Sequence, residues 1–333
     1  MGAPDGLDPR AMDATYAKGL HEVADGAHAY LQPDGSWGFS NAGLVVGDGG
    51  SLLVDTLFDL HLTRQMLEAM APLTAASPVT SVVNTHANGD HCYGNQLVAG
   101  EGVEVVTTDV SAREMEEVPA SLLGALTAAD LPSPLGDWVA HAFGRFDFEA
   151  IDTPPPDRTF SGRTTVVAGG RTVELIEVGP AHTGGDLIAW LPDSRVVFAG
   201  DILFIGSTPI MWAGPIGNWV AACELIESLD AAVVVPGHGP LATPERVRAV
   251  GDYLRFVRDG AAARHAAGMD ALDAAYDLDA EVDTSPYADW NDRERIVVTV
   301  DRVYGELDPA RPATGVVDLF TNMAAYTAVR RPR

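Results

Sequence analysis

The chain has 333 residues, of which 47% are hydrophobic and 20% charged, a composition typical of a globular protein with a sizeable core. Its 47 acidic residues outnumber 21 basic ones, and the formal charge of −26 disfavours nucleic acid and anionic membranes as partners. No apolar run reaches the roughly 20 residues that span a bilayer, no signal-peptide pattern opens the chain and there are only two cysteines, so we expect a cytoplasmic protein.

Short apolar runs rich in β-branched residues predict strands through the first two thirds of the chain. They cover residues 43–56, 80–85, 103–108, 164–178, 186–191, 195–201 and 231–237. Gly-rich turns at 47–50 and 168–171 divide two of these runs into hairpins. Apolar residues at helical spacing predict helices over 60–70 and 218–229, the second with Asn218 as N-cap. This interleaving favours two packed sheets with helices outside.

The pattern changes beyond residue 243. Residues 243–268 and 291–307 have helical periodicity, and we expect them to pack on the same body because no convincing linker precedes them. The sequence therefore predicts a single domain over 1–333, with a core at about 20–245 and a helical extension over 246–333.

Four segments follow predicted strands and place a histidine or an aspartate in a Gly-rich turn. They are THANGDH, GPAHTGGD, AGD and PGHG, and they carry His86, Asp90, His91, His182, Asp201 and His238. Loops beyond strand ends are where a rigid scaffold presents functional groups. Four imidazoles and two carboxylates suit a borderline-soft divalent ion, zinc first and iron or manganese after it.

The order His-x-x-x-Asp-His, HTGGD, GD and PGHG resembles the metallo-β-lactamase superfamily of metallohydrolases over roughly residues 20–245. The resemblance implies an α+β fold, a four-layer αββα sandwich with extra C-terminal helices, that binds two zinc ions in a groove between the sheet edges. It also implies ligands for each ion: His86 and His182 for the first, Asp90, His91 and His238 for the second, and Asp201 bridging them.

Asn88 departs from the family's usual His-x-His-x-Asp-His motif, because it stands where the first metal would find a second imidazole. An amide oxygen is a weaker donor to zinc, so we expect the first site to bind its ion less tightly. Asn88 could ligate, hydrogen-bond a water or an oxyanion, or leave the first site partly empty. A plain turn-forming role is the fourth reading.

The resemblance implies hydrolysis by a zinc-bound hydroxide, with Asp90 orienting it and accepting its proton. Asp55 ends a predicted strand, and we expect it to fix a ligand imidazole; a simple strand-terminating aspartate is the alternative. Cys92 follows His91 and is expected to pack rather than react, because no partner base is evident.

Aromatic residues near these motifs predict an apolar substrate pocket. Trp212 and Trp219 follow the expected bridging aspartate, and Trp37 lies in PDGSWGFSN. With the Phe-rich segment 141–151 they could wall a cavity over the metals, core packing being the alternative. A small-molecule substrate is then expected, a hydrophobic or aromatic acyl ester, thioester or lactone. Arg293 and Arg295, beside Trp290, could reach the rim and bind a substrate carboxylate, or could simply face solvent.

Three other functions remain open. His86, His182 and Asp201 alone form the two-histidine, one-carboxylate set of mononuclear non-haem iron, so a persulfide dioxygenase-like enzyme is the first alternative. A polyketide cyclase or thioesterase of a natural-product pathway is the second. A non-catalytic binder is the third and is disfavoured, because all six charged or imidazole ligands are present. The sequence does not indicate an oligomeric state.

Overall fold

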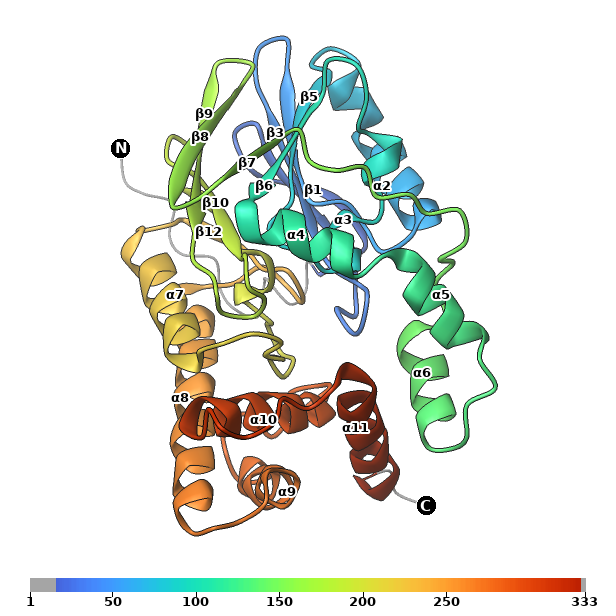
Figure 1. Cartoon of the computed structure of the whole chain (residues 1–333). Coiled ribbons are helices and arrows are strands. Elements are labelled where there is room, and N and C mark those ends of the chain that lie inside the picture. Colours follow the sequence, from blue (N-terminus) through green and yellow to red (C-terminus); the bar gives the residue numbers. More distant parts are fainter. Residues whose placement is uncertain (1–15, 331–333) are drawn as a thin grey trace.

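The computed structural model describes residues 16–330, which form two β-sheets with helices packed outside them (Figure 1). The first sheet contains, in spatial order, β1 (Gly19–Ala24), β2 (Ala27–Leu31), β3 (Ala42–Val46), β4 (Ser51–Val54), β5 (Val79–Val83), β6 (Glu104–Thr108) and β7 (Arg158–Phe160). The second contains β12 (Val233–Val235), β11 (Val196–Phe198), β10 (Leu187–Leu191), β9 (Arg171–Glu177) and β8 (Arg163–Ala168). The expected αββα arrangement with C-terminal helices is confirmed.

Alternating side chains on the strands divide the core into two parts. In β4, Leu52 and Val54 belong to the cluster between the sheets, whereas Leu53 belongs to the cluster beneath the helices. β10 alternates in the same way, with Ala189 on one side and Ile188 on the other. This period of two, with both faces apolar, is typical of strands buried on both sides.

The two sheets are joined at the end of the strands where both predicted hairpins turn. The β8–β9 turn consists of Gly169 and Gly170, which adopt positive φ angles of 54° and 80°. Gly169 O accepts a 2.7 Å hydrogen bond from Asp48 N in the β3–β4 turn. The loops that carry the predicted ligands lie at the other end of these strands.

Helices cover the outer faces of both sheets and extend below them. They are α2 (Leu60–Thr74), α3 (Gly89–Cys92), α4 (Asp109–Glu117), α5 (Ala120–Ala128), α6 (Leu135–Phe143), α7 (Ile216–Ser228), α8 (Pro244–Ala266), α9 (Ala271–Val282), α10 (Ile296–Leu307) and α11 (Val316–Arg330). Short 3₁₀ helices are η1 (Asn95–Leu97), η2 (Gly200–Ile202) and η3 (Arg293–Arg295). Within residues 16–330, every helix is too short or too polar to traverse a bilayer.

The predicted start of α7 is wrong. The helix begins at Ile216 with Pro215 as its N-cap, so Asn218 lies inside the first turn and caps nothing. Proline before the first turn presets a backbone suited to helix initiation, and this signal competes with the asparagine two residues further on.

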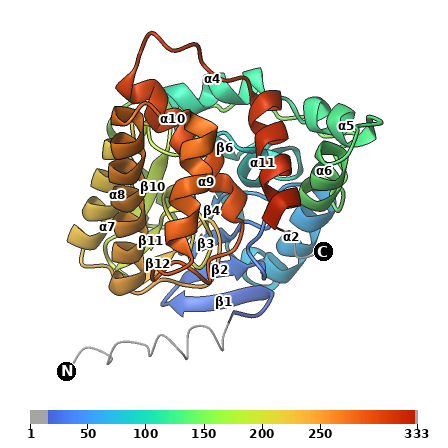
Figure 2. The same cartoon turned by 90° about the horizontal axis from the view of Figure 1, so that it is seen from below.

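The C-terminal helices lie together below the sheets, with α11 beside α6 (Figure 2). Two side chains of α10 accept hydrogen bonds from backbone amides in the loop between η2 and α7 and at the start of α7. Met211 N donates to Thr299 Oγ1 at 3.2 Å, and Ile216 N donates to Glu306 Oε1 at 2.8 Å. The extension therefore positions a loop of the core.

Candidate metal centre

The six residues expected to bind metal converge at one end of the two sheets. They come from the segments that follow four strands: His86, Asp90 and His91 after β5, the latter two in α3; His182 after β9; Asp201 after β11, in η2; and His238 after β12. In the first sheet β4, β5 and β6 are parallel, so they end at one edge. In the second sheet β11 and β12 are parallel, and β9 runs in the same direction because β10 is antiparallel to both β9 and β11. The topology thus brings together residues that are up to 152 positions apart, from 86 to 238.

Two groups of three can each surround an ion: His86, His182 and Asp201, and Asp90, His91 and His238. Within each group the ligand-type atoms lie within 4.8 Å of one another. Asp201 connects the groups, because Oδ2 lies 3.4 Å from His182 Nε2 and Oδ1 lies 3.1 Å from His91 Nε2. This position is that of a carboxylate shared by two ions.

Each of the four imidazoles is held by a contact at Nδ1. The partners are Thr85 Oγ1 for His86 at 3.1 Å, Asp55 Oδ2 for His91 at 2.9 Å, Ile210 O for His182 at 2.7 Å and Gly35 O for His238 at 3.1 Å. A carbonyl or carboxylate at Nδ1 places the proton there and leaves the Nε2 lone pair free to bind a metal. Asp55 therefore lies where a residue that orients His91 must lie.

The atoms that face the centre lack hydrogen-bond partners. His86 Nε2, His91 Nε2 and Asp201 Oδ1 are all buried without one. Buried polar atoms without partners are costly, and a cation between them would satisfy all three. The residues present therefore fit one or two divalent ions.

The pKa directions in the centre differ from group to group. Although burial opposes it, Asp201 raises the pKa of His91 well above its usual value and that of His238 to about 9, so these two rings must lose a proton to bind a metal. Burial, reinforced by the neighbouring His91, holds the pKa of His86 well below its usual value, so this ring is neutral at neutral pH. Although burial opposes it, the surrounding His238 and His91 hold the pKa of Asp201 well below the usual range. A neutral imidazole and an ionised carboxylate are the forms that bind metal.

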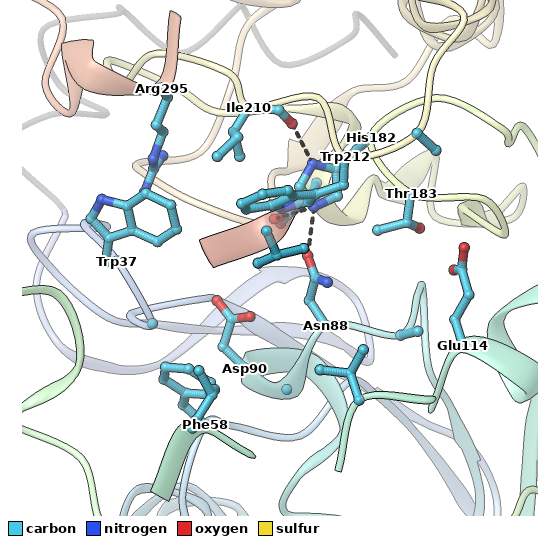
Figure 3. A pocket seen from close by; sticks show the side chains of 18 of the residues that line it. Trp37, Phe58, Asn88, Asp90, Glu114, His182, Thr183, Ile210, Trp212 and Arg295 are labelled. Atoms are coloured by element: carbon cyan, nitrogen blue, oxygen red, sulfur yellow. Dashed lines mark hydrogen bonds and ion pairs between the residues drawn. The ribbon is translucent and has the colours of Figure 1, made fainter. Parts of the chain in front are cut away.

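Asn88 lies at the first group, where its Oδ1 is 2.8 Å from His182 Nε2 (Figure 3). Burial lowers the pKa of His182, and the Ile210 carbonyl accepts from Nδ1, so the neutral ring presents a lone pair at Nε2. Two acceptor atoms then face each other, unless the amide is turned to place its nitrogen there. A shared cation would satisfy both acceptors.

A cavity of about 400 Å³ opens over the centre. Asn88, Asp90, His182, Asp201 and His238 form its polar floor. Its walls are largely apolar and include Trp37, Phe58, Phe143, Phe204, Ile210, Trp212, Val316 and Phe320. Figure 3 shows Trp37 and Trp212 on the walls and the Asp90 carboxylate directed inward.

Trp219 does not line this cavity. Its side chain is fully buried, its indole nitrogen donates to Ile202 O at 3.0 Å, and its ring centre lies 5.7 Å from that of His182. It packs behind His182 instead of facing the cavity. The apolar spacing of Trp219, Cys223 and Ile226 on α7 marks the buried helix face and could have shown this.

Several cavity residues were missed by sequence reasoning. Phe320 and Val316 come from α11, Arg302 from α10 and Glu114 from α4. Of the Phe-rich segment, Phe143 reaches the cavity, as expected for a wall. Arg295 and Arg302 are seven residues apart, a spacing that places two residues on the same face of a helix. This spacing was the sequence signal that could have indicated a helix face directed toward the site.

Cys92 is buried, and burial raises the pKa of its thiol. Its Sγ lies 3.6 Å from Ala87 O and does not line the cavity. A thiol in this state is a poor nucleophile, in agreement with a packing role.

Comparison with known proteins identifies the family. The family model described as the metallo-beta-lactamase superfamily matches residues 35–238, which contain all six ligand-type residues. The chain belongs to the metallo-beta-lactamase superfamily. As a fold of metallohydrolases, this superfamily accounts for the two sheets, the flanking helices and the paired His/Asp groups.

Curated relatives of this superfamily member have different activities. The 2,4-dinitroanisole O-demethylase subunit alpha of Nocardioides sp. is 26% identical over 73% of this chain and 63% of its own length. The linear primary-alkylsulfatase of Pseudomonas sp. is 25% identical over 67% of this chain and 45% of its own length. The acyl-coenzyme A thioesterase of Bos taurus is 25% identical over 65% of this chain and 78% of its own length. The chain thus spans less than two thirds of the first two relatives.

Solved structures share the fold of this superfamily member. The inverting sec-alkylsulfatase of Pseudomonas sp. superposes with a TM-score of 0.63 at 17% identity, covering 88% of this chain and 52% of the other. A metallo-beta-lactamase from Pontibacter korlensis superposes with a TM-score of 0.53 at 21% identity, covering 71% of this chain and 98% of the other.

Proposed function

We propose that this chain is a zinc-dependent hydrolase acting on a hydrophobic or aromatic acyl ester, thioester or lactone. One observation carries the proposal: two ligand groups joined by Asp201 form the floor of an apolar-walled cavity. The relationship to an acyl-coenzyme A thioesterase supports an acyl substrate. A soluble small molecule suits a cavity of about 400 Å³.

The first ion would be held by His86, His182 and Asp201, with Asn88 Oδ1 beside them. The second ion would be held by Asp90, His91, His238 and Asp201. When bound, ions at these positions lower the pKa of a coordinated water and polarise a carbonyl. Asp201 lies between the groups and keeps the two sites adjacent.

Asp90 is the proton acceptor in this proposal. Its Oδ2 lies 3.2 Å from His238 Nε2, and its carboxylate points into the cavity (Figure 3). Although burial opposes it, His91 and His238 lower the pKa of Asp90, so the group is ionised and able to accept a proton at neutral pH. The water oxygen forms the new bond to the acyl carbon, the water proton passes to Asp90, and Asp90 returns it to the departing alcohol or thiol.

The walls select the acyl group. Trp37 and Trp212 face the cavity, and Phe204 stacks over the His238 ring with centres 5.1 Å apart. Such walls exclude water and favour an apolar or aromatic body beside the floor. A polyketide cyclase or thioesterase would use the same walls and belongs to this substrate class.

Metal content and a substrate panel test the proposal. Protein purified without added metal should contain up to two equivalents of zinc, and it should hydrolyse an aryl ester, an acyl thioester or a lactone. Asp90→Ala should reduce the rate at least a hundredfold. One equivalent of iron with oxygen consumption would instead establish the dioxygenase, which needs only His86, His182 and Asp201. Cleavage of an alkyl sulfate but no acyl compound would also overturn the acyl assignment.

A further inference from the structure

Two arginines line the cavity: Arg295, the last residue of η3, and Arg302, within α10. Their seven-residue spacing places them on one face of the continuous segment formed by η3 and α10, about 10 Å apart along its axis. Arg293, by contrast, pairs with Asp279 at 2.7 Å and with Asp283 at 2.7 Å, and does not line the cavity. Of the two arginines expected from sequence at the rim, only Arg295 is there.

Arg295 already has its partners within the protein. It pairs with Asp292 at 3.2 Å, donates to Ser207 Oγ at 3.1 Å, and its guanidinium carbon lies 4.4 Å from the centre of the Trp37 ring. Its side chain is almost fully buried. These contacts fix Arg295 as part of the wall and leave its charge compensated.

Arg302 differs, because no carboxylate in the described part of the chain pairs with it. Arg302 Nε, like Arg295 Nε, is buried without a hydrogen-bond partner, and the partly exposed side chain of Arg302 borders the cavity. A buried donor without an acceptor is costly, and an anion that enters the cavity would offset that cost.

The surroundings of Arg302 limit where an anion can bind. The cavity mouth is apolar, since Val118 and Val316 line it and remain 50% and 51% exposed. The acidic lining residues Glu114 and Glu117 come from α4, and Glu114 Oε1 accepts from Gly184 N at 3.0 Å. A negative group would be repelled by these carboxylates and would favour the α10 wall.

We propose that the substrate carries a carboxylate on its apolar acyl body and that Arg302 binds this carboxylate. The inference rests on the proposed hydrolase function, because it assigns the substrate class of the same cavity. Arg302 contributes the anion-binding donor, the aromatic walls receive the body, and the ester or thioester linkage lies over the floor.

Two matched esters test the substrate class. The 4-nitrophenyl ester of hexanoic acid and the mono-4-nitrophenyl ester of adipic acid differ by a terminal carboxylate. The parent should prefer the adipate ester in kcat/KM, chiefly through a lower KM. Arg302→Gln should reduce this preference roughly ten- to a hundredfold, the size of a lost charge-assisted hydrogen bond, and Arg302→Lys should restore part of it. Arg64→Gln makes the same charge change at an exposed position away from the cavity and should preserve the preference.

A binding measurement separates this inference from the proposed function. The anilides of the same two acids resist hydrolysis and can be titrated by calorimetry into metal-loaded protein. The carboxylated anilide should bind the parent at least tenfold more tightly, and Arg302→Gln should abolish the difference. If that pattern appears while neither ester is cleaved, the carboxylate site stands and the hydrolase proposal falls. Equal binding of the two anilides to the parent, or an undiminished difference in Arg302→Gln, overturns the inference.

Discussion

The imidazole of His91 is fixed by Asp55, whose Oδ2 lies 2.9 Å from His91 Nδ1. Asp55 follows β4 and adopts a left-handed backbone conformation with φ 63°. Its Oδ1 accepts from Thr85 N at 2.7 Å, and its Oδ2 also accepts from Thr85 Oγ1 at 2.8 Å. The carboxylate therefore joins the end of β4 to the loop that carries the ligands.

Replacement Asp55→Asn should weaken the second metal site. Thr85 N requires an acceptor at Oδ1, so the amide nitrogen of the variant would face His91 Nδ1. His91 must then carry its proton on Nε2, which blocks ligation. We expect zinc affinity to fall roughly ten- to a hundredfold, measured by competition with a chromophoric chelator.

Asp59→Asn is the matched control for that variant. Asp59 is also a buried aspartate, but it caps α2 by accepting from Leu62 N at 2.7 Å and touches no ligand. Asparagine is an equally good N-cap, so zinc affinity should be retained. Equal losses in both variants would contradict the role assigned to Asp55.

Replacement Asn88→His should strengthen the first metal site. Asn88 Oδ1 already lies 2.8 Å from His182 Nε2, so a side chain at this position points to the first group, and an imidazole is the better zinc donor. The variant should retain more metal than the parent after dialysis against increasing chelator, whereas Asn88→Ala should retain less. Unchanged retention in both would favour a plain turn-forming asparagine.

Removal of metal should destabilise the fold. The centre contains unpartnered His86 Nε2, His91 Nε2 and Asp201 Oδ1, and ions bound there stabilise only the folded chain. At a free zinc concentration a thousandfold above Kd the gain is about 4 kcal/mol. A chelator should therefore lower the Tm by several degrees and added zinc should restore it, as followed by calorimetry. In His91→Ala the response should shrink.

Two tryptophans expected to act alike should behave differently. Trp219→Phe removes the hydrogen bond to Ile202 O and leaves a cavity, so the free energy of unfolding should fall by about 2 kcal/mol or more. Trp212→Phe alters a half-buried cavity wall, so its free energy of unfolding should change by less than about 1 kcal/mol while KM for an apolar ester rises. Urea unfolding and ester kinetics on both variants check this. The reverse pattern would contradict the assignment.

The metal centre could be predicted from sequence because its signals are local. Each candidate ligand follows shortly after a strand and has a glycine close to it in the sequence, so the motif and its place in the fold appear in one segment. The hairpin at Gly169 was predictable for the same reason, since two glycines fit a turn that requires positive φ.

The cavity walls could not be predicted in this way. Phe320 approaches Trp212, with ring centres 6.1 Å apart, across more than a hundred residues of sequence. Such contacts depend on how α10 and α11 pack against the core, and helical periodicity gives a helix its apolar face but not its partner. Sequence alone likewise could not show that Arg302 Nε lacks a partner, because this depends on where the residues around it lie in the fold.

The clasp formed by Trp37, Arg295 and Phe204 has a wider consequence. Arg295 comes from the segment just before α10, its guanidinium carbon lies 5.2 Å from the Phe204 ring centre, and Phe204 stacks on the ligand His238. Arg295, which lies outside the matched residues 35–238, thus packs on the ring that supports His238 and also lines the cavity. Substitutions just before α10 can therefore change the cavity wall beside His238 while the loops that carry the six metal-binding candidates stay unaltered.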